Sequence, residues 1–136
     1  MLLAFPLILI VFGVYNAIVF TNGVAALGDV IVSVNMVSGA VWQLTTSDLL
    51  ITGALFLLFF EVLKATRTGA GNILDHMFST FVFIACLVEF IVVRQASTST
   101  FFIIMVIAFI DVVAGFSVSI RSARRDLAVG YGGDGL

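Results

Sequence analysis

The sequence predicts an all-α membrane protein in which four transmembrane helices form an antiparallel bundle with both termini in the cytoplasm. Of the 136 residues, 62% are apolar and only 10% are charged, whereas about 25% of the residues in a soluble domain are charged. The apolar residues gather in four runs, each near the length of about 20 residues that a bilayer crossing requires. Four crossings and short connections use the whole chain, so residues 1–136 are expected to form a single domain.

The first helix is expected at about residues 2–28. The run from Leu2 to Phe20 is apolar, and no Lys or Arg precedes it, so it is interpreted as a membrane span and not as a signal peptide. The segment 21–46 stays apolar but is interrupted by Gly and Asn residues. It is interpreted as an extension of the first helix followed by an interfacial loop.

The remaining helices are expected at about residues 47–66, 75–93 and 100–121. Ser47 and Asp48 are good first residues for the second helix, because their side-chain oxygens can accept hydrogen bonds from exposed backbone N–H groups. Asp75 can open the third helix in the same way. The glycine-rich end of the chain, residues 122–136, is expected to be a flexible cytoplasmic tail.

The cations predict the orientation. Arg94 falls at one end of the expected helices, and five cations fall at the other end: Lys64, Arg67, Arg121, Arg124 and Arg125. Because Lys and Arg are retained in the cytoplasm, the side with five cations is predicted to be cytoplasmic. Arg67 and the three tail arginines are interpreted as contacts to anionic lipid, so no nucleic-acid partner is expected.

Three acids stand inside the apolar runs and are the main candidates for a functional site: Glu61, Glu89 and Asp111. An ionisable group at membrane depth costs several kcal/mol unless it is neutralised, paired or hydrated. Small residues share the faces of all three acids, which predicts that they point towards other helices.

Each acid also has a structural interpretation. Glu61 can pair with Lys64 three residues later or face the lipid headgroups. Glu89 can form an interhelical hydrogen bond or contact Arg94, or it can act in function. Asp111, near the middle of its span, has either a functional or assembly role or is a protonated carboxyl that joins helices.

Three further polar residues are interpreted in structural terms. Asn16 is expected to form an interhelical hydrogen bond, and His76 to be a solvated or capping residue. Cys86, the single cysteine, cannot form an intramolecular disulfide. No phosphate-binding loop, metalloprotease motif or nucleophile elbow is present. We therefore expect no enzymatic activity, no cofactor and no metal.

The order of these features resembles the phosphate-starvation-inducible E (PsiE) family of small bacterial inner-membrane proteins. The similarity extends from about Val11 to Arg125. It rests on a loop with Gly28 and Asp29, the sequence Phe59-Phe60-Glu61, the run from Lys64 to Asp75, the sequence Val92-Val93-Arg94 and a basic end. Glu89 departs from the family pattern, which would have a cation late in the third helix, and both polar connections carry fewer charges. The resemblance implies a multi-pass protein of the bacterial plasma membrane and supplies no catalytic residue.

Two classes of function follow. One is an accessory or structural membrane subunit, or a self-associating bundle, with its buried acids in helix contacts. The alternative is an oligomeric proton or cation channel or transporter that uses Asp111 and Glu89. The expected partners are the lipid bilayer and either further copies of the chain or a larger membrane complex. Convergence of Glu89 and Asp111 on one hydrated cavity would favour ion movement.

Overall fold

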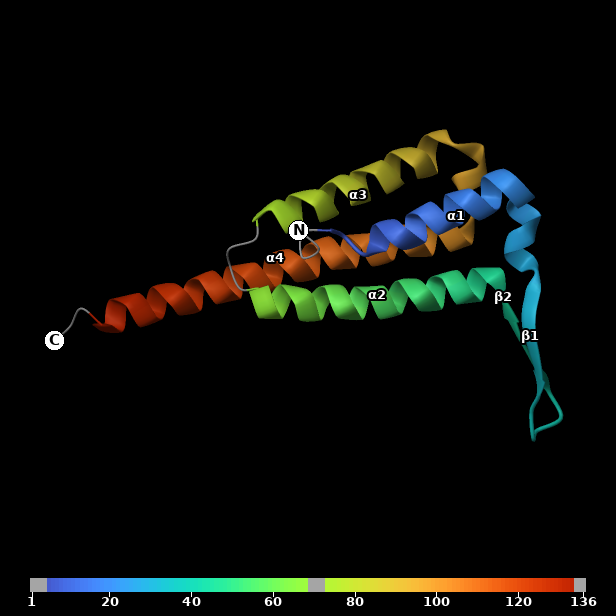
Figure 1. Cartoon of the computed structure of the whole chain (residues 1–136), viewed down its shortest axis with the longest axis horizontal. Helices are drawn as coiled ribbons and strands as arrows, with labels where there is room; N and C mark the ends of the chain where they lie inside the picture. The colour runs from blue at the N-terminus through green and yellow to red at the C-terminus, as the bar shows by residue number, and fades with distance from the viewer. Residues whose placement is uncertain (1–4, 69–72, 134–136) are drawn as a thin grey trace.

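The described residues are mostly helical, and four α-helices follow one another among them (Figure 1). The computed structural model describes residues 5–68 and 73–133, with side chains except at residues 67, 68, 118, 119 and 121–133. Its helices are α1 (Ile8–Asn22), α2 (Thr46–Thr68), α3 (Ile73–Val92) and α4 (Ser99–Gly133). Two short 3-10 helices, η2 (Val24–Gly28) and η4 (Arg94–Ala96), and two strands, β1 (Val30–Asn35) and β2 (Val41–Thr45), complete the described elements.

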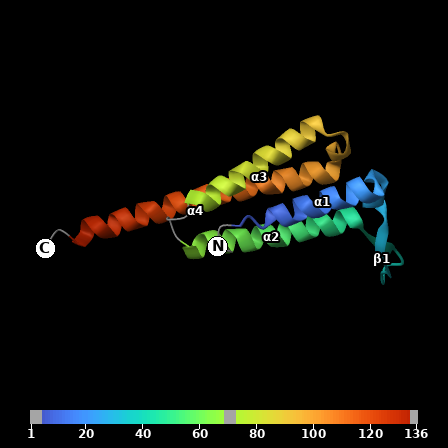
Figure 2. The same cartoon turned by 45° about the horizontal axis from the view of Figure 1, so that its top comes forward.

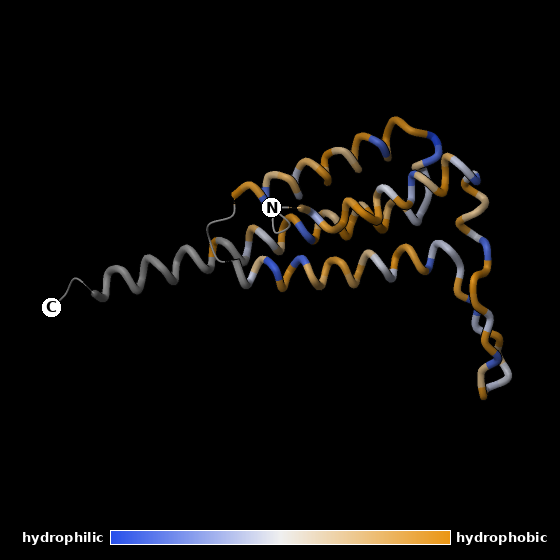
Figure 3. Tube along the Cα trace, viewed as in Figure 1, coloured by the Kyte–Doolittle hydropathy of each residue, from blue (hydrophilic) through white to orange (hydrophobic). Residues whose placement is uncertain are grey.

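Three of the described helices are long and apolar enough to cross a membrane: Thr46–Thr66, Ile73–Val92 and Ser99–Ser117. These segments are largely hydrophobic along their length (Figure 3). The helix α1 is also apolar, but its 15 residues make it shorter than the other three. The three long helices indicate a membrane location.

The helices pack around α4, which contacts α2 and α3, while α1 contacts each of the other helices. The α1 helix lies alongside the others in both cartoon views (Figures 1 and 2). Tyr15 of α1 is fully buried, and its ring meets the edge of the Phe101 ring of α4 at a centroid distance of 5.0 Å. Phe90 of α3 stacks on the same Phe101 ring. An aromatic group in the core therefore joins α1, α3 and α4.

The beginnings of α2 and α4 lie side by side. The hydroxyl oxygens of Ser47 and Thr100 are 2.6 Å apart, and either hydroxyl can donate the hydrogen bond. The first turn of α2 is also capped, because the Asp48 N–H donates to Thr45 Oγ1 and the Thr45 N–H donates to the Asp48 carboxylate. This reciprocal arrangement is a capping box. It starts α2 at Thr46, one residue before the expected Ser47, and it places Asp48 in the first turn.

The expected extension of the first helix to residue 28 was wrong, because α1 ends at Asn22, and the segment expected to be a loop forms η2 and a β-hairpin. The expected all-α fold therefore needs correction. Gly23 stops α1: it adopts a φ of 86°, and its N–H closes the helix on the carbonyl of Val19. Glycine is the usual residue at such a helix end, because a side chain there would be strained.

The hairpin pairs β1 with β2 in antiparallel fashion, with a register shift between Val30 and Val32. Its turn places Gly39 at a φ of 91°, and the Gly39 N–H donates to the carbonyl of Met36. Val and Ile dominate β1, and such β-branched residues favour strands over helices.

The fourth helix is longer than expected. It continues to Gly133, where the sequence predicted a flexible tail after residue 121. Residues 121–129 are rich in Ala, Arg and Leu, which are good helix formers. Extending an existing helix avoids the free-energy cost of nucleating a new one, so residues of modest helix propensity are sufficient to continue α4.

Candidate functional site

Four ionisable side chains come together where the last turns of α2, the first turn of α3 and the middle of α4 meet. They are Glu61, Lys64, Asp75 and Asp111, which we call the carboxylate cluster. Relative exposure is 3% for Glu61, 5% for Asp75 and 6% for Asp111, and the Lys64 side chain is 11% exposed. Carboxylates are seldom buried to this degree unless they are paired.

Lys64 pairs with two of the three carboxylates. Its Nζ lies 3.3 Å from Glu61 Oε1 and 3.4 Å from Asp75 Oδ1. The Glu61 contact connects two residues of one helical face, as the sequence predicted, whereas the Asp75 contact crosses from α2 to α3. At 3.4 Å the Asp75 contact is an ion pair, and Asp75 Oδ1 has no hydrogen-bond partner among the described residues.

The same two residues of α2 also hold the segment that leads into α1. The Leu7 N–H donates to the Glu61 carboxylate, and Lys64 Nζ donates to the carbonyl of Phe5 at 3.0 Å. These backbone groups lie at the start of a helix, where the first N–H groups have no partner inside the helix. Glu61 and Lys64 therefore connect α2 both to α3 and to the entry of α1.

Asp111 is close enough to Glu61, Lys64 and Asp75 for their charges to act on its carboxyl group. Ser79 of α3, which is also buried, donates a hydrogen bond to its carboxylate. The second oxygen, Oδ2, is buried and has no hydrogen-bond partner among the described residues. An unsatisfied buried oxygen is costly unless a proton, a water, a cation or a side chain outside the described residues pairs with it.

The register of α2 and α4 explains why Glu61 and Asp111 meet. The two helices start together at Ser47 and Thr100. Glu61 follows Ser47 by 14 residues and Asp111 follows Thr100 by 11 residues. At a rise of 1.5 Å per residue, their depths differ by only about 4.5 Å.

His76, one residue after Asp75, lies between α3 and α4. Its ring stacks on Phe116 at a centroid distance of 5.1 Å, so the expectation of a solvated or capping residue misses this contact. A Cβ atom at Gly115 would lie 2.9 Å from His76 Nδ1. Glycine at position 115 therefore allows the imidazole to approach α4 closely.

Glu89 and Asn16 lie at the other end of the helices. Asn16 Nδ2 donates to Glu89 Oε2 at 3.4 Å and to the carbonyl of Phe12 at 3.0 Å. The long distance to Glu89 is that of a weak hydrogen bond, but the predicted interhelical contact of Asn16 is confirmed. Glu89 follows Asp75 by 14 residues of α3, which is about 21 Å at the helical rise. Glu89 therefore does not converge with Asp111.

Arg94 joins neither group among the described side chains. Arg94 is exposed, and no ion pair between it and Glu89 is found among the described side chains. The predicted contacts of Arg67, Arg121, Arg124 and Arg125 concern side chains outside the described residues. No group of three or more His, Cys, Asp or Glu side chains in the described part of the chain is arranged to hold a metal ion.

The Tyr15 hydroxyl is a polar contact that the sequence analysis missed. It donates to the carbonyl of Gln95 at 2.8 Å and lies 2.7 Å from Thr98 Oγ1. It thereby attaches α1 to the connection between α3 and α4. The sequence could have indicated this contact, because Tyr15 lies in an apolar run and a buried Tyr hydroxyl usually forms a hydrogen bond.

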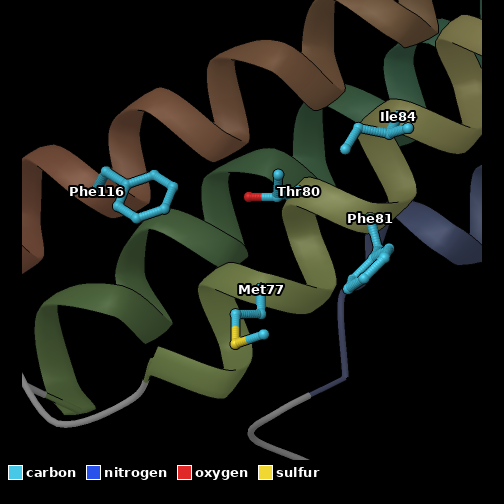
Figure 4. A pocket seen from close by; sticks show the side chains of 5 residues that line it. All are labelled: Met77, Thr80, Phe81, Ile84 and Phe116. Carbon is cyan, nitrogen blue, oxygen red and sulfur yellow. The ribbon is translucent and has the colours of Figure 1, made fainter.

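Two grooves among the described residues are apolar and lie on the outer surface of the molecule. One, of about 440 Å³, is lined along α2 by Thr52, Leu55, Phe56 and Phe59. The other, of about 260 Å³, lies between α3 and α4 (Figure 4) and is lined by Met77, Thr80, Phe81, Ile84 and Phe116. Neither groove includes a member of the carboxylate cluster.

Comparisons with protein-family models, with curated proteins and with solved structures found no match for this chain.

Proposed function

We propose that this chain is a multi-pass protein of the bacterial plasma membrane with four crossing helices in antiparallel order. The cation distribution supports cytoplasmic termini. The path of α1 supports its crossing despite its length. It begins beside Glu61 at the end of α2 and brings Tyr15 to the connection between α3 and α4. The proposed membership in the PsiE-like family rests on the sequence resemblance alone.

Within this membrane framework, we propose an accessory or structural role, either as a subunit of a larger complex or as a self-associating bundle. The observation that carries this proposal is the connectivity of the carboxylate cluster. Lys64 contacts groups from the entry of α1, from α2 and from α3. Carboxylates with such contacts hold the helices of one chain in place relative to one another. The apolar grooves on the outer surface then offer sites where a helix of a neighbouring subunit can pack.

Mass determination of the intact particle, extracted in mild detergent, tests the accessory role. We expect a mass well above the 14.6 kDa of one chain. Phe56→Ala and Phe81→Ala are matched variants, since each removes one exposed ring from one of the two grooves. The variant that lowers the mass identifies the associating face. A single-chain mass after extraction in native lipid discs would refute the proposal.

A second candidate function is proton or cation movement through an oligomer, and Asp111 Oδ2 is the observation in its favour. If all four groups of the carboxylate cluster are ionised, three negative charges face one positive charge. A buried excess of negative charge is strongly unfavourable. Uptake of a proton or a monovalent cation would relieve it and would give Oδ2 a partner.

Flux into liposomes distinguishes the two candidates. Transport predicts that vesicles with wild-type protein acidify or take up cation faster than empty vesicles, and that Asp111→Asn abolishes the difference. Glu89→Gln is the matched control, because Glu89 is about 21 Å from the cluster along α3 and its loss should leave flux in place. Wild-type vesicles no leakier than empty ones would end the transport candidate and leave the accessory proposal intact.

A further inference from the structure

The β-hairpin has one apolar face and one largely polar face. Side chains alternate between the two faces of a strand, so directly paired residues share a face. The register places one set of residues on the first face: Val32, Val34, Trp42 and Leu44. The opposite face carries Ser33, Asn35, Val41 and Gln43, and Ile31 lies at the register shift without a partner in the other strand. We call the first set the apolar hairpin face.

The described part of the chain does not cover the apolar hairpin face. Val34 is 39% exposed and Trp42 is 47% exposed. An isolated two-stranded sheet is only marginally stable in water, and such sheets normally pack against something else. The hairpin therefore requires a covering surface that a single chain does not supply.

Its position shows which surface is available. The hairpin follows η2 and leads directly into α2, and its base is fixed by a hydrogen bond from the Thr46 N–H to the carbonyl of Asp29. From there it extends across the direction of the helix axes in both views (Figures 1 and 2). If the helices cross a bilayer, a segment with this direction lies along the membrane surface.

The chemistry of the hairpin fits that surface. No charged residue occurs between Asp29 and Asp48, so no ionised group resists contact with the lipid. Tryptophan is favoured at the boundary between headgroups and acyl chains. Amphipathic helices lie in this boundary with their apolar face against the acyl chains, and a hairpin with one apolar face can lie there in the same way.

We propose that the hairpin is a membrane-surface element, with the apolar hairpin face in contact with phospholipid at the outer leaflet and the polar face towards water. It would fix the depth of α1 and α2, whose ends it joins. This inference rests on the proposed crossing of the helices, so its test must separate the two.

Trp42 is the only tryptophan of the chain and therefore reports on the hairpin alone. The protein is reconstituted in phosphatidylcholine vesicles with bromine either near the headgroup end or near the tail end of the acyl chains. We expect bromine near the headgroup to quench Trp42 fluorescence more strongly than bromine near the tail. Absence of quenching in both vesicles would overturn the proposal, provided that the helices are inserted.

Insertion is measured with a second reporter. The double variant Trp42→Phe with Phe109→Trp places the only tryptophan on the exposed surface of α4, near the middle of the span Ser99–Ser117 and outside both apolar grooves. Bromine near the tail should quench this reporter more strongly. If both reporters remain unquenched, the membrane crossing fails. If only Trp42 remains unquenched, the hairpin proposal fails alone.

Two neighbouring substitutions test the face. Val34→Lys places a charge on the apolar hairpin face and should abolish the quenching of Trp42, whereas Ser33→Lys on the opposite face should retain it. Equal quenching in the two variants would refute the assignment of the face. A hairpin covered by a second copy predicts a different result: an unquenched Trp42, and a disulfide between copies when Val34→Cys is combined with Cys86→Ser.

Discussion

Substitution of Lys64 by methionine removes the only cation of the carboxylate cluster while keeping most of the side-chain volume. Glu61 and Asp75 then remain buried at 3% and 5% exposure without their cation. Breaking a buried ion pair by removing one partner costs about 3–5 kcal/mol. Unfolded chains in a membrane also find polar partners, so we place the loss in the free energy of unfolding at about 3 kcal/mol. That corresponds to roughly a hundredfold fall in the folding equilibrium constant.

The loss can be measured by titrating the protein in mild-detergent micelles with SDS and determining the folded fraction by pulse proteolysis. Arg94→Met is the control, because Arg94 is exposed and substitutions of this kind change stability by about 0.5 kcal/mol or less. Adding Glu61→Gln to Lys64→Met should recover part of the loss, since it removes one uncompensated charge. Equal midpoints for Lys64→Met and Arg94→Met would show that the cluster does not stabilise the fold.

Three further substitutions test other contacts by the same assay. Tyr15→Phe should cost about 1–3 kcal/mol, because both partners of its buried hydroxyl lose a hydrogen bond; an unchanged midpoint would contradict this. Gly115→Ala should cost about 1–3 kcal/mol, because its Cβ would approach His76 too closely, whereas Gly13→Ala should be neutral or stabilising, since nothing lies within 4 Å of that position. Asp111→Asn should change stability by less than about 1 kcal/mol if the native carboxyl carries a proton, because the amide has the same shape and charge; a loss as large as that of Lys64→Met would indicate an ionised carboxylate.

The three long helices could be predicted from the sequence, because length and hydrophobicity identify a membrane span without reference to any partner. Residues 47–66 and 75–93 match α2 and α3 within two residues at each end. The Glu61–Lys64 pair was predictable for a related reason. Residues three positions apart on a helix are neighbours whatever surrounds them.

The composition of the carboxylate cluster could not be predicted in this way. The position of Asp75 in the sequence predicts only the start of a helix. Its contact with Lys64 could not be predicted, because it depends on how α2 packs against α3. Asp111 and Glu61 suggested separate depths, because the register between α2 and α4 becomes visible only in a contact between the two helices, from Ser47 to Thr100 in their first turns. A single sequence specifies which face of a helix is polar but not which turn of another helix it meets.

The hairpin is a different case, because its signal was present in the sequence. β1 is rich in Val and Ile, and a Ser-Gly pair separates it from a second alternating run. Strong hydrophobicity over residues 21–46 concealed this alternation, since an apolar run is compatible with either a helix or a strand. Gly23 was the deciding residue, because it ends α1 before the run begins.

The distribution of polar contacts also bears on the choice between the two proposed functions. Tyr15 and the Ser47–Thr100 pair hold the helices at one end, and the carboxylate cluster holds them at the other. Between them, α4 buries the apolar side chains of Phe101, Ile104 and Ala108. A proton bound at the cluster would have to pass this apolar layer to reach the opposite end of one chain. Transport therefore requires a path between copies, and its rate per chain should rise with protein density in the vesicle, whereas a rate per chain independent of density would contradict an oligomeric path.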